Sequence, residues 1–160
     1  MNRTAGFVAG LGAACVVAVS AAYAEPVTSP EQAIDVITSV TATTSKPFYN
    51  GSYFKIEVTA TETCTLVKTL TDYSADDEKT KTVETTYDVA QIDPAKISAD
   101  GLGGVKFWSL GEATVFPMET KLGGNFSAML PGDSLTVRDE AAETPMIIEA
   151  LTYLSGHCSG

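Results

Sequence analysis

Residues 53–66 read YFKIEVTATETCTL, and this stretch decides the fold. Apolar and polar residues alternate along it, and the apolar parity carries Phe54, Ile56, Val58, Ala60, Cys64 and Leu66. The other parity carries Tyr, Lys, Glu and Thr side chains. A period of two over this length predicts a β-strand with one buried face and one solvated face. We therefore expect a half-buried sheet with Cys64 on its buried side.

Glu62 interrupts the alternation because it falls on the buried parity. A β-bulge or bend that resets the register there is commoner than a buried carboxylate. The strand-like pattern also runs from Tyr53 to Tyr73, which is too long for a typical strand. We expect the segment to bend or split near Glu62; the alternative is a buried Glu62 with a function.

The last part of the chain has helical spacing. The residues Ile147, Leu151, Leu154 and Cys158 recur at intervals of four, three and four. Such residues form one stripe on a helix, so Cys158 is predicted to face inward. A closing amphipathic helix is expected over residues 139–154, with Pro145 compatible only if the helix proper begins near Thr144.

A first helix is predicted over residues 30–40. Ser29 is a capping residue, Pro30 stands at the first helical position, and Gln32 follows three residues after the cap. Between the two helices, strands are expected near residues 80–91, 105–110, 113–116 and 134–138. A long irregular connection is expected between the last two of these strands, because Pro117, Gly123-Gly124 and Pro131-Gly132 interrupt it.

This order of elements predicts an α+β fold. We expect a bent antiparallel sheet of about five to seven strands with the N-terminal helix and the C-terminal amphipathic helix packed on it. The layout is similar in topology to pleckstrin-homology-like and related small sandwiches. No residue motif identifies a family.

The first 24 residues have the pattern of a signal peptide. Arg3 supplies a positive start, residues 5–22 are small and apolar, and Ala22-Tyr23-Ala24 fits the small-x-small cleavage rule. Lipidation at Cys15 is the alternative, although Leu11 stands one place too far back for it. We expect one exported domain over residues 25–160. Its expected location is periplasmic or extracellular, with a bacterial envelope favoured, and no stable membrane insertion is expected after cleavage.

Two cysteines remain after cleavage, Cys64 and Cys158. An even pair in an exported chain predicts a disulfide bond, because the compartment is oxidising. A metal or redox site would require clustered ligands, and these two residues lie far apart. We therefore predict a helix-to-sheet disulfide, and neither a metal nor a cofactor.

Charge and motifs limit the function. Twenty acidic residues against ten Lys and Arg give a net charge of -10, which disfavours nucleic acid as a partner. His157 is the only histidine, and no nucleophile–base motif accompanies it. The acidic segment 72–78 is interpreted as a solvated turn rather than a calcium site, since its spacing is not that of an EF-hand.

The aromatic pair Phe107-Trp108 gives the best candidate surface. Adjacent residues on a strand face opposite sides, so we place Phe107 in the core and Trp108 near a second surface, joined by Met118 and Met129. Cover by the protein's own loop is the alternative. These features predict a non-catalytic exported domain that binds a partner protein or a small ligand. The other hypotheses are a structural or assembly accessory of the cell envelope and a carboxylate-dependent hydrolase.

Overall fold

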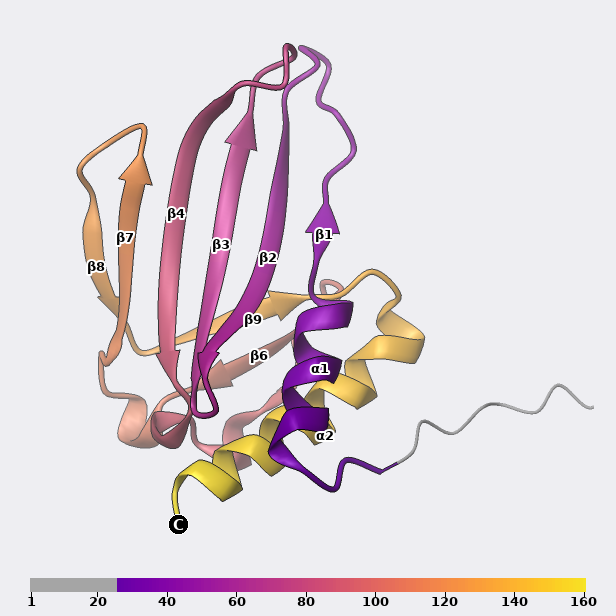
Figure 1. The fold of residues 1–160 in the computed structure, drawn as a ribbon, viewed down its shortest axis with the longest axis vertical. Coiled ribbons are helices and arrows are strands. Elements are labelled where there is room, and N and C mark those ends of the chain that lie inside the picture. The colour runs from indigo at the N-terminus through magenta and orange to yellow at the C-terminus, as the bar shows by residue number, and fades with distance from the viewer. Residues whose placement is uncertain (1–25) are drawn as a thin grey trace, which may run out of the picture.

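The computed structural model describes residues 26–160, so the predicted signal peptide and Cys15 lie outside the described residues. The described chain forms two helices and two antiparallel sheets, which confirms the predicted α+β class (Figure 1). The large sheet has the strand order β1–β2–β3–β4–β7–β8. A small sheet has the order β5–β6–β9.

The bounds of the strands in the large sheet are Thr43–Thr44 (β1), Tyr53–Glu62 (β2), Thr65–Tyr73 (β3), Lys79–Asp88 (β4), Phe116–Leu122 (β7) and Ser127–Leu130 (β8). Those in the small sheet are Ser98–Ala99 (β5), Gly104–Trp108 (β6) and Gly132–Thr136 (β9). The helices are Pro30–Val40 (α1) and Glu140–Cys158 (α2). Short 3-10 turns cover Val89–Gln91 (η1), Pro94–Lys96 (η2) and Leu110–Glu112 (η3).

The predicted split near Glu62 is confirmed. β2 and β3 form an antiparallel hairpin, and their register shifts between Ala60 and Glu62. Glu62 is exposed, so the alternative of a buried carboxylate is wrong. Cys64 consequently lies in the hairpin turn, half-buried, rather than within a strand.

Helix α1 matches its prediction, because the Ser29 side chain accepts a hydrogen bond from the backbone N–H of Gln32 and the helix covers the predicted residues; its buried face carries Ala33, Ile37 and Val40. Helix α2 begins at Glu140, within the expected range of residues 139–154, and it continues past the expected end to Cys158. Asp139 caps it by accepting from the N–H of Ala142, and Pro145 lies inside the helix. The condition that the helix proper begin near Thr144 is wrong, because the helix continues through Pro145 although a proline at this sixth helical position removes one backbone hydrogen bond.

The chain between Ala113 and Asp133 also differs from the prediction. β7 begins at Phe116, so residues 113–115 are not strand, and the expected irregular connection contains β7, β8 and the start of β9. Pro117 is tolerated near the beginning of β7, where the ladder to β4 has not started. The turn between β7 and β8 contains Gly123, whose φ is +79°.

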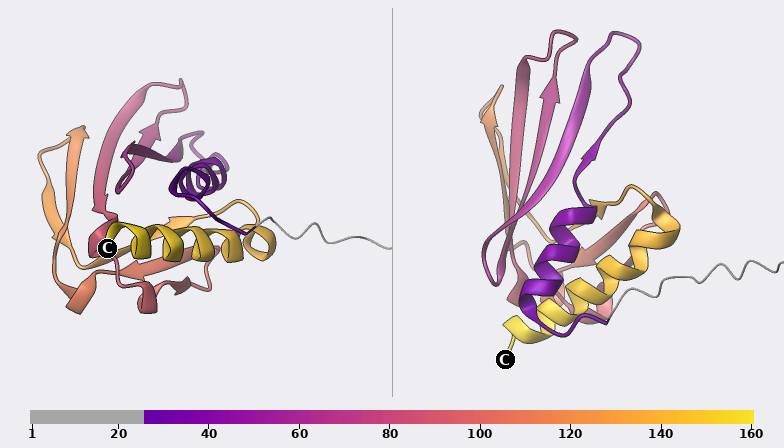
Figure 2. Two further views of the ribbon diagram at one scale, coloured as in Figure 1. Left: turned by 60° about the horizontal axis from the view of Figure 1, so that its bottom comes forward. Right: turned by 45° about the vertical axis from the view of Figure 1, so that its right-hand side comes forward.

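The core lies at one end of the large sheet. The rings of Tyr87, Phe107 and Phe116 meet edge to face there, with centroids 5.1–5.9 Å apart. Helix α1 packs on α2 and on β2, while α2 packs on β6 and η1. Figures 1 and 2 show β2, β3 and β4 extending well beyond both helices. The other end of the sheet is therefore free of helical cover.

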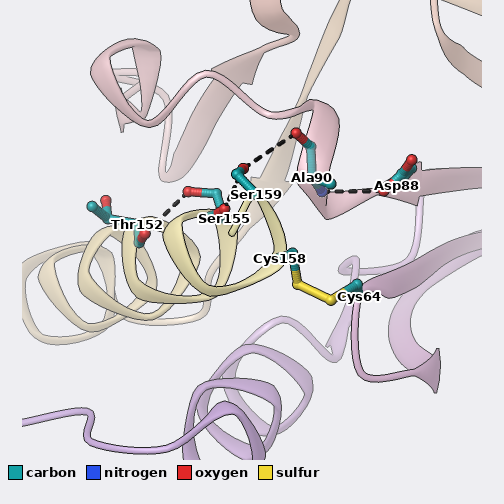
Figure 3. The surroundings of a disulfide bond; sticks show 7 residues. All are labelled: Cys64, Asp88, Ala90, Thr152, Ser155, Cys158 and Ser159. Carbon is teal, nitrogen blue, oxygen red and sulfur yellow. Dashed lines mark hydrogen bonds between the residues drawn. A yellow bond between two sulfur atoms is a disulfide. The ribbon is translucent and has the colours of Figure 1, made fainter.

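The predicted disulfide is present between Cys64 and Cys158, with an S–S distance of 2.10 Å and a Cα–Cα distance of 5.7 Å. It joins the β2–β3 turn to the end of α2 (Figure 3). The same helix end contacts η1, because the Ser159 hydroxyl lies 3.4 Å from the Ala90 carbonyl oxygen and donates to it. The C-terminus is thus fixed at the helix-covered end of the sheet.

Candidate ligand-binding groove

A groove of about 470 Å³ lies beside the helix-free part of the large sheet. Its apolar walls come from β3, β4, the β7–β8 hairpin and its turn, and they consist of Leu70, Val83, Met118, Phe126 and Leu130. The strand β9 closes one side with Asp133. The groove therefore lies where the two sheets approach each other.

Strand register explains why these side chains share one face. Leu70 pairs with Val83, and Val83 pairs with Thr120. One step further along, Lys68 pairs with Thr85, which pairs with Met118. Directly opposed residues in a sheet project to the same side. The groove face is thus a continuation of the core face beyond the point where the core side chains end.

A polar cluster forms one end of the groove. The Lys68 ammonium forms an ion pair with Asp133 and also donates to the Ser134 carbonyl oxygen at 3.2 Å. The Tyr87 hydroxyl donates to Asp133 at 2.6 Å, and the Ser134 N–H donates to the same carboxylate at 2.7 Å. The Lys68 and Asp133 side chains are 15% and 19% exposed, so both remain accessible from the groove.

Tyr87 is a fixed part of this cluster. Its side chain is completely buried between Phe107 and Phe116. Burial, followed by the nearby Asp133 charge and the hydrogen bond to it, raises the pKa of Tyr87 well above its ordinary value. The phenol therefore stays protonated at neutral pH and donates a hydrogen bond to Asp133.

The turn between β7 and β8 closes the other side of the groove. A Cβ at Gly123 would lie 2.3 Å from the Thr80 carbonyl oxygen and 3.1 Å from the Lys81 Cα, so only glycine allows this approach. Phe126, which follows in the same turn, lines the groove while 58% exposed. The hairpin thus forms a wall that rests directly on the start of β4.

The surface predicted from the sequence is placed differently. Phe107 is buried and Trp108 is 40% exposed, as predicted from their opposite orientation. Trp108 lines a shallow hollow of about 300 Å³ on the outer face of the small sheet, against Gly132. Met118 lies in the groove instead. Met129, 50% exposed, belongs to the opposite face of the β7–β8 hairpin, because it pairs with Pro117 while Met118 pairs with Ala128.

Met118 and Met129 together line a shallow hollow at the β7–β8 hairpin, but Trp108 lies apart from them on the small sheet, so the three residues do not form one patch. The sequence patterns did not indicate the polar cluster, in which Lys68 and Asp133 line the groove and the buried Tyr87 lies behind them. Lys68 gave a signal, since it stands on the apolar parity between Leu66 and Leu70. No sequence pattern pointed to Asp133, because its ion pair with Lys68 depends on how β9 crosses the large sheet.

In the acidic turn after β3, one carboxylate and the Ser74 hydroxyl take part in hydrogen bonds. The Tyr53 hydroxyl donates to Asp77 at 2.8 Å, and the Ser74 hydroxyl accepts from two backbone N–H groups. Within residues 26–160, no group of three or more His, Cys, Asp or Glu residues is arranged to hold a metal ion. His157 is exposed and its ring stacks on Tyr153 near the end of α2.

None of the helices in residues 26–160 combines the length and apolar character needed to cross a membrane. Comparison with known proteins adds no assignment: no family model, no curated protein and no solved structure matches this chain.

Proposed function

We propose that the chain is a non-catalytic exported domain that binds a small, largely apolar molecule in the groove between its two sheets. The observation that carries the proposal is the groove itself, which has apolar walls and one polar cluster. Small-molecule sites are typically concave and mostly apolar, with a few polar groups that fix the orientation of the ligand. A volume of about 470 Å³ lies within the usual range for such sites.

The hydrogen bonds of the polar cluster support binding rather than catalysis. Asp133 accepts hydrogen bonds from Lys68, Tyr87 and Ser134. These bonds involve both of its carboxylate oxygens. These three donors hold the carboxylate in one orientation and take up most of its acceptor sites, of which a carboxylate has about four. Lys68 in turn donates to two partners and keeps one N–H for a ligand acceptor. The cluster is thus suited to orienting a ligand.

Export belongs to the same proposal. A disulfide between Cys64 and Cys158 persists in an oxidising compartment, and the first 24 residues have the pattern of a signal peptide. We propose that residues 25–160 act outside the cytoplasm as one domain. Mass spectrometry of the mature protein tests this point, with cleavage after Ala24 as the expected result.

Methionine methyl NMR on residues 25–160 tests the binding site directly. The chain has Met118 on the groove face and Met129 on the opposite face of the same hairpin, with Met146 in α2 as a third reporter. Titration with a neutral alkyl alcohol and with its carboxylate analogue is expected to shift the Met118 resonance and leave the other two in place. Absence of any Met118 shift with either probe would contradict the proposal.

A matched pair of variants on β4 checks the assignment. Val83 faces the groove, whereas Thr86 pairs with Val67 on the other face of the sheet. Val83→Phe is expected to fill the groove and weaken probe binding at least tenfold. Thr86→Phe, the control, is expected to leave binding unchanged. Equal effects of the two variants would mean that the probes bind elsewhere.

A partner protein at Trp108 is the second candidate function. The exposed apolar side chains Trp108 and Leu102 lie together at the hollow on the outer face of the small sheet. Tryptophan is enriched at the centre of protein interfaces. The expected result for this function is loss of a co-purifying protein with Trp108→Ala and its retention with Val83→Phe.

A further inference from the structure

The groove is locally positive in a strongly acidic protein. Two lysines, Lys68 and Lys81, and one carboxylate, Asp133, line it, so its lining carries a formal charge of +1. The whole chain carries -10. A ligand with one negative charge would neutralise the lining, whereas a cation would add to its charge.

The two lysines lie at opposite ends of an apolar strip. Lys68 is directly opposite Thr85, and Lys81 lies four residues before Thr85 on the same face of β4. At about 3.3 Å per strand residue, the two positions are about 13 Å apart. The opposed pair Leu70 and Val83 lies between them. A chain-like apolar ligand would therefore run along the strands with a cation at each end.

Of the two cations, Lys81 is the one free to bind a ligand anion. Lys68 already has Asp133 as its counter-ion. Lys81 is exposed and takes part in none of the ion pairs among the described residues, although Asp72 lies opposite it on β3. An anionic group held at this open end also keeps part of its hydration, which lowers the cost of binding it.

We propose that the groove binds an amphipathic monoanion of the fatty-acid class. Its carboxylate contacts Lys81 at the open end, and its alkyl chain lies across the paired side chains of Leu70 and Val83 and continues toward Met118 and Leu130. The inference rests on the proposed function and specifies the ligand class for the same site. Asp72, opposite Lys81, weakens the attraction and sets a limit on affinity.

Calorimetry with decanoate, decanol and decylamine tests the proposal. Decanoate is expected to bind about two- to fivefold more tightly than decanol, which is the range that an exposed charge pair supplies. Decylamine is expected to bind most weakly. The advantage of decanoate is expected to shrink in high salt, because salt screens exposed charges.

Charge variants assign the effect to Lys81. Lys81→Met keeps an apolar stem and is expected to remove the preference for decanoate over decanol. Asp72→Asn is expected to increase the preference, since it removes the competing carboxylate. Lys106→Met, on the outer face of the small sheet, is the matched control and is expected to change neither affinity.

The outcomes separate this inference from the proposed function. Equal affinity for decanoate and decanol, or a preference for decylamine, would overturn the ligand class while binding in the groove stands. A preference for decanoate that survives Lys81→Met would overturn the assignment to Lys81. Failure of all three probes to bind or to shift the Met118 methyl resonance would overturn both proposals.

Discussion

At Gly123 the backbone adopts a φ of +79°, and an added Cβ would lie 2.3 Å from the Thr80 carbonyl oxygen. Gly123→Ala is therefore expected to destabilise the protein by about 2–4 kcal/mol, through backbone strain and a contact with main-chain atoms that cannot move away easily. Urea denaturation of the mature chain measures this loss. The same variant is expected to displace the β7–β8 turn and weaken probe binding in the groove.

Gly101 provides the control at the residue scale. Its φ of +74° is similar, but nothing lies within 4 Å of the position that its Cβ would occupy. Gly101→Ala is expected to cost about 1 kcal/mol, which is the strain of the left-handed conformation alone. Equal losses for the two variants would show that the close approach to Thr80 does not contribute.

At the scale of the element, the start of α2 is held by a second carboxylate besides the Asp139 cap. Glu143 accepts hydrogen bonds from the N–H groups of Arg138 and Asp139 and pairs with the Arg138 guanidinium. Burial raises the pKa of Glu143, but these three interactions outweigh burial and lower it below its ordinary value of 4.5. The ionised side chain therefore stabilises the folded state.

This shift predicts the direction of a pH effect. A carboxyl with a lowered pKa in the folded state contributes stability above its unfolded pKa and loses it as the pH falls through its folded pKa. Glu143→Gln is expected to lower the free energy of unfolding by about 1 kcal/mol at neutral pH, as loss of a helix cap does. In acid, the variant and the wild type are expected to have the same free energy of unfolding. Denaturation at several pH values measures it, with Glu140→Gln, exposed in the same first turn, as the control.

Sequence patterns predict those elements whose signals are local. Helix α1 follows from Ser29 and Pro30, and the β2–β3 hairpin follows from an alternation that Glu62 interrupts. The strands β7 and β8 were missed because Pro117 and Gly123 are residue types that are common in loops. In the structure, Pro117 lies at the beginning of β7, where no ladder bond to β4 is needed, and Gly123 lies in the turn between β7 and β8. Whether a proline or glycine ends a strand depends on its neighbours in the sheet, which the sequence does not specify.

At the scale of the whole molecule, the groove depends on where the sheet is left uncovered. The core residues and the groove residues share the same parity on β3 and β4, so hydrophobicity alone does not distinguish Leu66 from Leu70. The lengths of the helices and the disulfide at Cys158 confine α1 and α2 to one end. The disulfide itself was predictable because two cysteines allow one pairing.

The disulfide gives the last prediction. The double variant Cys64→Ser, Cys158→Ser opens a link between residues 94 positions apart, for which chain entropy predicts a loss of about 4–5 kcal/mol. Since the link lies at the helix-covered end, the folded variant is expected to keep the groove and to show the same Met118 shift with decanoate as the wild type. Urea denaturation measures the stability, and wild type with its disulfide reduced is the control, expected to lose a similar amount. Loss of probe binding in the fully folded variant would contradict the prediction that the disulfide and the groove are independent. It would mean that the link between α2 and the β2–β3 turn also sets the geometry of the distant groove.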